Sequence, residues 1–202
     1  REISMTDFVL SPGPSVPGAL RVPGNKGIWA GITCEFIEFL VLFIVYFVAR
    51  SHFPEEFRQG AARLSPLAGT VITLVMVSSS LCIAASVATI RAGQRRVSLY
   101  WLIAGLLVAL GYPLAKFLEF RWNLAQGIHG DSGIFFTVYY YLTINHLVHA
   151  FWGILGIGWV LARHLFGGYS AEDYSGLEAL ACYWHATDII WLTIFPFFYV
   201  LA

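Results

Sequence analysis

Four pairs of ionisable residues interrupt the apolar stretches of this sequence, and the members of each pair stand three positions apart. The pairs are Glu35 and Glu38, Lys116 and Glu119, His146 and His149, and His185 and Asp188. In a helix this spacing places both members of a pair on one face. Ionisable groups at membrane depth are costly, so they usually face protein or water and mark functional sites. These residues are therefore the candidate site.

Their side-chain types fit several kinds of chemistry. Histidines with carboxylates are suitable ligands for Cu, Fe or Zn, although His146 and His149 lack the interleaved carboxylate of an HExxH motif. Buried series of Glu, His and Asp also serve as proton relays. Recognition of a lipid headgroup or a partner subunit is a further alternative, and a hydrogen-bond network that only fixes helix packing is the simplest. The residues alone favour packing, lipid or partner over metal.

A competing function stays open beside these. It is an intramembrane metal-binding or proton-conducting protein that uses His146, His149, His185 and Glu38.

Five apolar stretches must position the candidate residues. Each has about 20 residues or more, which is enough to cross the hydrocarbon core of a membrane as a helix. They run over residues 27–49, 66–90, 98–122, 133–162 and 178–202. The chain is 58% hydrophobic and 12% charged, whereas a soluble domain has about 25% charged residues. We therefore expect an all-α integral membrane protein, built as a bundle of five transmembrane helices.

Residues 1–26 differ in composition from the rest. They are rich in proline and glycine and lack an apolar core, so we expect neither a regular helix nor a signal peptide there. This predicts a cytoplasmic tail over 1–26 and a five-helix domain over 27–202. Residues 54–60 are expected to form a surface loop. A formal net charge of zero gives no basic field that would attract nucleic acid. The lone cysteines are expected to be small core hydrophobes: Cys34, Cys82 and Cys182.

The positions of Lys and Arg predict the orientation. Five crossings put the two termini on opposite sides. The side of the N-terminus has seven of these residues: Arg1, Arg21, Lys26, Arg91, Arg95, Arg96 and Arg163. The other side has five: Arg50, Arg58, Arg63, Lys116 and Arg121. Because cytoplasmic loops carry an excess of Lys and Arg, we expect a cytoplasmic N-terminus and a periplasmic C-terminus.

The depth of each residue follows from the helical rise of about 1.5 Å per residue. It places one group of side chains at a similar level, about 10–20 Å from the N-terminal face: Glu35, Glu38, His149, His185 and Asp188. We expect them to meet between the first, fourth and fifth stretches, with His149 or His185 as the partner of Glu38. Lys116 and Glu119 lie nearer the opposite face, where they pair or snorkel.

Several spaced motifs resemble subunit III of the haem–copper oxidases. The last stretch is similar to that family's YWHFVDxVW segment: Tyr183-Trp184-His185, Asp188 and Trp191. The fourth is similar to its FF…TGxHxxH segment: Phe135-Phe136, then Thr143-Ile144-Asn145-His146 and His149. The first is similar to its GMWxFIxxE segment: Gly27-Ile28-Trp29, then Glu35. Glu119 also falls where the family has a glutamate. Two departures are Ile144, which replaces a glycine, and the extra acid Glu38.

Other segments resemble the short five-helix branch of the family, which includes quinol-oxidase subunit III and the accessory, or activation, protein of nitric oxide reductase. The similarity is closest to the latter and rests on Val22-Pro23-Gly24, the stretch 116–120 and Phe195-Pro196.

The resemblance implies a noncatalytic accessory subunit in a bacterial inner membrane. Haem, with copper or non-haem iron, would belong to the large catalytic subunit that is its partner, and this chain would carry no cofactor. The family's V-shaped bundle implies a phospholipid cleft, here beside Trp29, Glu35 and Glu38, and a role in assembly, proton uptake and durable turnover. The remaining polar residues would hold the bundle together or carry protons: Glu38, Glu119, His146, His149, His185 and Asp188.

Overall fold

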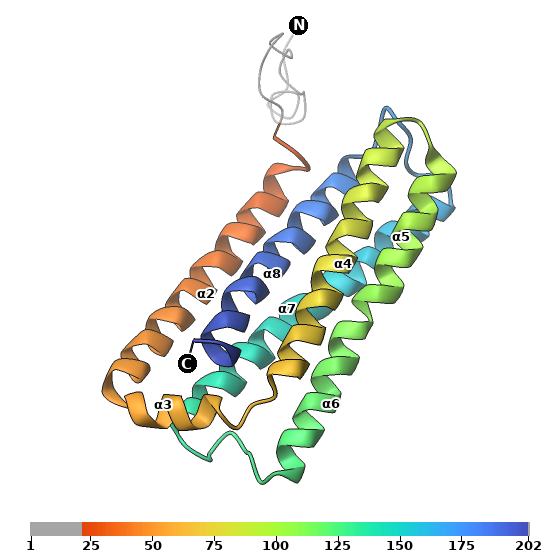
Figure 1. Cartoon of the computed structure of the whole chain (residues 1–202). Coiled ribbons are helices and arrows are strands. Elements are labelled where there is room, and N and C mark those ends of the chain that lie inside the picture. The colour runs from red at the N-terminus through yellow and green to blue at the C-terminus, as the bar shows by residue number, and fades with distance from the viewer. Residues whose placement is uncertain (1–21, 202) are drawn as a thin grey trace, which may run out of the picture.

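The computed structural model describes residues 22–201 as a bundle of helices, with no strand among those residues (Figure 1). The helices are α2 (Lys26–His52), α3 (Pro54–Ala61), α4 (Pro66–Arg91), α5 (Arg95–Ala109), α6 (Gly111–Ala125), α7 (Ile134–Leu165) and α8 (Ser175–Tyr199). The first long helix begins at Lys26, where the Asn25 side chain accepts a hydrogen bond from the Ile28 amide and caps the helix. The expected tail lies almost wholly outside the described residues.

Helices α5 and α6 follow one another across Leu110 and form one long column (Figure 1). Pro113 explains the interruption because it lacks the amide hydrogen that would bond the carbonyl of Ala109. The third apolar stretch of the sequence therefore folds as two consecutive helices.

Four segments of the described chain are long and apolar enough to cross a membrane: α2, α4, the α5–α6 column and α7. The fifth column, α8, has 25 residues but carries Glu178, His185 and Asp188. It packs against α2, α4 and α7, and more than half of its residues are buried. A helix enclosed by other helices needs fewer apolar side chains, since most of its surface faces protein. The expected all-α membrane bundle is confirmed.

Hydrogen bonds at both ends of the bundle fix the direction of its helices. The amide of Gly24 donates to Glu178 Oε2 at 3.4 Å, so α2 and α8 begin at one end. Arg50 Nη2 donates to the carbonyl of Leu201 at 2.7 Å, so both helices finish at the other. We call these the N-terminal and C-terminal ends of the bundle. The described chain thus starts and finishes at opposite ends (Figure 1).

The segment that follows α2 is a helix rather than the expected loop. Pro54 opens α3, and Glu55 and Glu56 lie in its first turn. Proline at the first helical position and acids at the N-terminus both favour a helix start. Glu56 Oε2 also accepts a hydrogen bond from the amide of Ile134, at 3.1 Å. Helix α3 therefore caps α7, whose own N-cap residue is a glycine.

Small residues let the helices approach closely. A Cβ added to Gly153 on α7 would lie 2.6 Å from the ring of Trp184 on α8, so only glycine fits there. Ser79 on α4 donates to the carbonyl of Gly105 on α5 at 3.1 Å. Such contacts are typical of helix pairs in membranes.

The cysteines are not core residues. Cys34 is exposed on α2, and Cys82 and Cys182 are partly exposed. The expectation that they are small core hydrophobes is therefore wrong. Many apolar side chains also point outwards from the bundle, as a membrane or partner requires.

Candidate functional site

One polar cluster lies where α2, α7 and α8 meet. We call it the open cluster; its members are Glu35, Glu38, Asn145, His149 and Thr187. Glu35 is only 2% exposed. Its Oε1 accepts a hydrogen bond from Thr187 Oγ1 at 3.1 Å and lies 3.6 Å from His149 Nδ1. Its Oε2 is buried without a hydrogen-bond partner.

The second carboxylate of the open cluster lies nearer the surface. The Glu38 side chain is 45% exposed. Asn145 Nδ2 donates to its Oε1 at 2.6 Å, and His149 Nε2 donates to its Oε2 at 3.2 Å. The imidazole of His149 therefore lies between two carboxylates, and a protonated ring offers one N–H to each. Of the two partners expected for Glu38, His149 is present and His185 is not.

The open cluster continues into the core through α8. The fully buried His146 donates from Nε2 to the carbonyl of Thr187 at 3.0 Å. Its Nδ1 then accepts from the Tyr112 hydroxyl at 2.7 Å. These partners assign the neutral tautomer of His146, with the proton on Nε2. Polar contacts therefore connect the half-exposed Glu38 with Tyr112, by way of His149, Glu35, Thr187 and His146.

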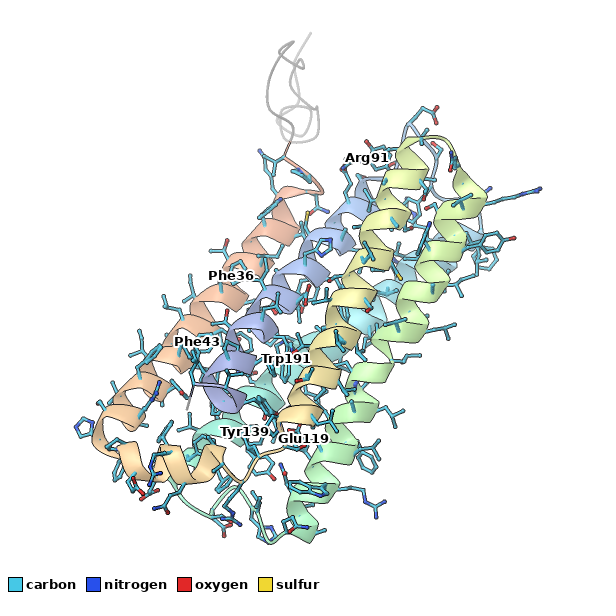
Figure 2. All side chains as sticks on the ribbon, in the orientation of Figure 1. Phe36, Phe43, Arg91, Glu119, Tyr139 and Trp191 are labelled. Atoms are coloured by element: carbon cyan, nitrogen blue, oxygen red, sulfur yellow. The ribbon has the colours of Figure 1, made fainter. Side chains whose placement is uncertain are left out.

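A second polar group lies towards the C-terminal end, between α6, α7 and α8. We call it the sealed cluster: Lys116, Glu119, Tyr139 and Tyr199, all buried. Figure 2 labels Glu119 and Tyr139. Lys116 Nζ donates to Glu119 Oε2 at 2.8 Å and to the Tyr199 hydroxyl at 3.1 Å. Tyr199 donates in turn to Glu119 Oε1. Of the two alternatives for Lys116, pairing with Glu119 is therefore present, and snorkelling is not.

Aromatic rings enclose the lysine and separate the two clusters. Lys116 Nζ lies 4.8 Å from the centre of the Trp191 ring and within 6 Å of three further rings. On its other side, the Trp191 ring lies 5.4 Å from that of His146. Glu119 is thus bonded within the sealed cluster and is not part of the polar series that ends at Tyr112.

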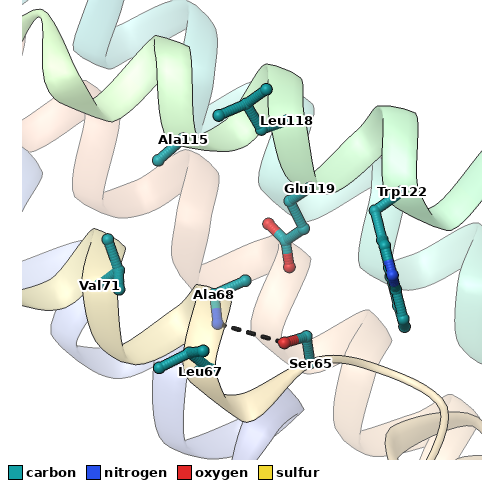
Figure 3. Close-up of a pocket in the computed structure, with 8 residues that line it drawn as sticks. All are labelled: Ser65, Leu67, Ala68, Val71, Ala115, Leu118, Glu119 and Trp122. Atoms are coloured by element: carbon teal, nitrogen blue, oxygen red, sulfur yellow. Dashed lines mark hydrogen bonds between the residues drawn. The ribbon is translucent and has the colours of Figure 1, made fainter.

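Glu119 also faces a groove between α4 and α6 (Figure 3). The groove has a volume of about 390 Å³, and its other lining residues are mostly apolar, among them Ala68, Leu118 and Trp122. Because Lys116 and Tyr199 already bond both oxygens of Glu119, nothing in the groove requires a polar ligand.

His185 and Asp188 do not join the open cluster, so that expectation is wrong. His185 lines a cavity beside α4, and Asp188 is buried with its Oδ1 lacking a hydrogen-bond partner. The residue of α8 that meets Glu35 is Thr187, which sequence reasoning missed. Consecutive helix residues are about 100° apart, so Thr187 and Asp188 face different neighbours. The one feature of the sequence that pointed to Thr187 was its hydroxyl group, directly before Asp188 in the chain.

The histidines do not converge on a metal site. Both nitrogens of His146 are hydrogen-bonded, and His185 faces α4 while His149 faces α2. Within residues 22–201, no group of three or more His, Cys, Asp or Glu side chains is placed to hold a metal ion. The described residues therefore do not fit the metal-binding alternative.

Two outward grooves flank the open cluster. One, of about 360 Å³, is lined by residues of α2, α7 and α8 that include Ile28, Trp152, Trp159 and Tyr183. Tyr183 donates from its hydroxyl to the carbonyl of His149 at 3.2 Å and so joins this groove to the cluster. The other, of about 440 Å³, is lined by Glu38, Asn145 and neighbouring residues. Trp29 lies apart, at the start of α2, where its Nε1 donates to the carbonyl of Pro23 at 2.8 Å.

Comparison with known proteins gives a consistent set of relatives. Residues 18–202 match the family described as cytochrome c oxidase subunit III. A cytochrome c oxidase subunit 3 from Synechocystis sp. is 30% identical over 177 residues, which cover 87% of this chain and 74% of the relative. Subunit 3 of a cytochrome bo(3) ubiquinol oxidase from Buchnera aphidicola is 24% identical, over 86% of this chain and 92% of the relative. A haem-copper oxidase subunit I+III from Aeropyrum pernix is 23% identical, over 88% of this chain and 22% of that protein.

Proposed function

Because this chain belongs to the cytochrome c oxidase subunit III family, we propose that it is a noncatalytic accessory subunit of a haem–copper oxidase-superfamily complex in respiratory electron transport. Its partner is then a large catalytic subunit that binds haem, with copper or non-haem iron. The relative named subunit I+III supports a direct partnership between two such chains. Deletion of this chain tests the role. We expect membranes that keep the haem of the large subunit but lose activity during sustained turnover, and unchanged activity would contradict it.

Within the family, we propose nitric oxide reductase as the partner enzyme and a terminal oxidase as the alternative. Support comes from the Val22-Pro23-Gly24 segment, which packs on α8. Gly24 has a φ of 73°, and a Cβ there would lie 2.9 Å from the Cα of Ala179. Mass spectrometry of the large subunit that co-purifies with the tagged chain distinguishes the two alternatives. Identification of an oxidase subunit I would contradict the proposal of nitric oxide reductase.

We propose that phospholipid occupies the groove between α2, α7 and α8, with Glu35 at its inner side and Trp29 near the headgroups. The observation that carries this is the buried Glu35, whose Oε2 lacks a protein partner. Its neighbour His149 accepts a hydrogen bond, through its backbone carbonyl, from Tyr183, and Tyr183 lines the groove. Aromatic side chains are enriched where proteins meet the membrane interface, so the tryptophans that line the groove suit contact with lipid. The test is lipid analysis of the purified complex. Gly156→Leu should lower the bound phospholipid because Gly156 lines the groove, whereas Gly158→Leu, with no atom within 4 Å of its Cβ position, should not.

The series from Glu38 to Tyr112 supports a role in proton uptake for the partner enzyme. Each neighbouring pair makes a hydrogen bond or lies within 3.6 Å, and the imidazole of His149 can carry a proton between the two carboxylates. The competing function as a proton-conducting protein uses the same residues, but the family favours a partner enzyme as the receiver.

We propose a bacterial inner membrane location with a cytoplasmic N-terminus. The buried pairing of Lys116 with Glu119 removes Lys116 from the loop charges, so the comparison becomes seven Lys and Arg residues against four. This strengthens the positive-inside argument. Residues 1–26 are then a cytoplasmic tail and residues 27–202 the membrane domain. A reporter fused to the C-terminus should be active in the periplasm, and cytoplasmic activity alone would reverse the orientation.

A further inference from the structure

The groove of about 440 Å³ beside the open cluster lies between α2 and α7, and we call it the Glu38 groove. Glu38 lines it from α2. Side chains three or four positions apart line it from one side of α7, among them Tyr141, Ile144 and Val148. These three are 47–67% exposed. The chain therefore leaves an apolar groove open on its outer surface, with one carboxylate in the lining.

The carboxylate of this groove lies near the middle of the membrane. At a helical rise of about 1.5 Å per residue, Glu38 is about 18 Å from the start of α2 and about 21 Å from its end. The hydrocarbon core of a bilayer is about 30 Å thick, so lipid headgroups and bulk water lie far from this position. The side chain is nevertheless 45% exposed. A carboxylate at this depth is costly unless protein or another polar group covers it.

Glu38 can accept more hydrogen bonds than the chain itself supplies. Asn145 donates to one of its oxygens and His149 to the other. A carboxylate has about four acceptor sites, so about two remain for a donor on the exposed side. Acyl chains, the part of a lipid that reaches this depth, have no N–H or O–H group to donate. A protein side chain has, and for this reason the groove fits a protein partner better than a lipid.

A second copy of this chain does not supply the missing donor. Two copies that meet through the same face bring the same residues together. Residues 27–49 of α2 and 134–162 of α7 contain neither Lys nor Arg. Such a dimer would place the Glu38 carboxylate of one copy near that of the other, and like charges in contact disfavour an interface. The partner that complements this face is therefore a different chain.

We propose that the Glu38 groove is the docking surface for a transmembrane helix of the large catalytic subunit, and that this helix carries a hydrogen-bond donor or a cation level with Glu38. The inference rests on the proposed function, which supplies the partner. Side chains of the incoming helix fill the groove as ridges pack into grooves between helices. Val41, one turn after Glu38 on α2 and 53% exposed, extends the apolar contact along the membrane. The polar contact at Glu38 fixes the register of the two chains.

Photo-crosslinking of the full chain in its native membranes tests where the partner binds. The photoreactive p-benzoylphenylalanine replaces either Ile144, which lines the groove, or Leu81, which is 67% exposed on α4. We expect the Ile144 position to capture the haem-binding large subunit, identified by mass spectrometry, and the Leu81 position to capture none of it. Equal capture at the two positions would overturn the docking surface. So would capture of only lipid, or of only a second copy of this chain, from the Ile144 position.

A matched pair of larger side chains checks the groove without a crosslinker. Ile144→Trp fills the groove and should lower the amount of large subunit that co-purifies per chain by about tenfold, because overpacking a fitted contact is destabilising. Leu81→Trp makes a similar change on α4 and should leave that amount unchanged. Immunoblots of the membranes show whether both variants accumulate like the wild type. An unchanged amount of large subunit with Ile144→Trp would overturn the inference.

A second pair of variants tests the polar contact at Glu38. Glu38→Leu removes the acceptor and should lower the amount of co-purified large subunit by about tenfold, since it leaves the partner's donor buried and unsatisfied. Glu38→Gln keeps an acceptor oxygen and should retain most of the large subunit. A leucine suits contact with acyl chains. Full retention of the large subunit in Glu38→Leu would therefore show that lipid covers this face, and would overturn the inference.

Purification of the unmodified chain distinguishes a failure of the docking surface from a failure of the proposed function. If no haem-binding subunit co-purifies with the wild-type chain, both are wrong. If that subunit co-purifies but the Ile144 position captures none of it, the docking surface alone is wrong.

Discussion

The open and sealed clusters contain similar residues but differ in exposure and in how completely they are hydrogen-bonded. Each has a buried glutamate that contacts a basic side chain and accepts a hydrogen bond from a hydroxyl group. Glu35 contacts His149 and Thr187. Glu119 contacts Lys116 and Tyr199. In the sealed cluster the partner is Lys116, and four rings enclose it. In the open cluster the partner is His149, 20% exposed, and a second acid reaches the surface. Lys116 is held by hydrogen bonds to Glu119 and Tyr199, whereas an imidazole can gain and lose a proton near neutral pH.

The difference in hydrogen bonding indicates which cluster stabilises the bundle and which one can bind a ligand or transfer protons. Both oxygens of Glu119 are bonded, so the sealed cluster is complete within the chain. Glu35 keeps an unbonded buried oxygen, and grooves flank its neighbours. We therefore expect substitutions in the sealed cluster to affect stability most and those at the outer end of the open cluster to affect function most.

The largest expected effect is that of Lys116→Met. It leaves Glu119 buried without its cation, which costs about 3–5 kcal/mol in the free energy of unfolding for such pairs. Unfolding of the purified protein in mild detergent measures it. The double variant Lys116→Met with Glu119→Leu should recover most of the loss, because replacing both partners with apolar groups is often nearly neutral. A single variant as stable as the wild type would remove the distinction between the clusters.

A smaller loss is expected at the inner end of the open cluster. Tyr112→Phe removes the hydroxyl that donates to His146 Nδ1 and leaves a buried acceptor unsatisfied. The expected cost is about 1–3 kcal/mol. Tyr100→Phe, at an exposed position of α5, is the matched control and should cost almost nothing. If the two variants unfold alike, the Tyr112–His146 bond does not hold the core.

Glu35→Gln should cost less again, about 0.5–1.5 kcal/mol, since the amide oxygen still accepts from Thr187. The charge that faces His149 is lost, however. We therefore expect less phospholipid in the purified complex together with near-normal assembly. A loss of stability as large as that of Lys116→Met would show that the open cluster is a structural pair of the same kind.

The smallest effect on stability is expected for Glu38→Gln, within about 0.5 kcal/mol, because the side chain is nearly half exposed. Its effect on the complex is expected to be the clearest functional one. Turnover of the whole enzyme should fall by about twofold to thirtyfold, the range in which such networks modulate a distant site. Normal turnover with intact assembly would remove the proposed proton role.

The sequence predicts the bundle and its polar pairs well, because apolar length and three-residue spacing depend on one segment at a time. It also predicts His149 or His185 as the partner of Glu38, since their depths follow from helical rise, but it does not choose between the two. It does not predict the rotation of α8. Trp184 packs against Gly153 and thereby turns Thr187 towards Glu35. The rotation of α8 depends on how its side chains pack against α7, and no pattern within either segment alone predicts it.

The account rests on the chain being one subunit of a larger redox complex. The most direct measurement is purification of the tagged full chain from its own membranes in mild detergent, followed by a haem spectrum of the product. We predict that a large haem-binding subunit co-purifies in a fixed ratio and gives the spectrum of a haem protein. A product that contains only this chain, as a free monomer without haem, would contradict the account.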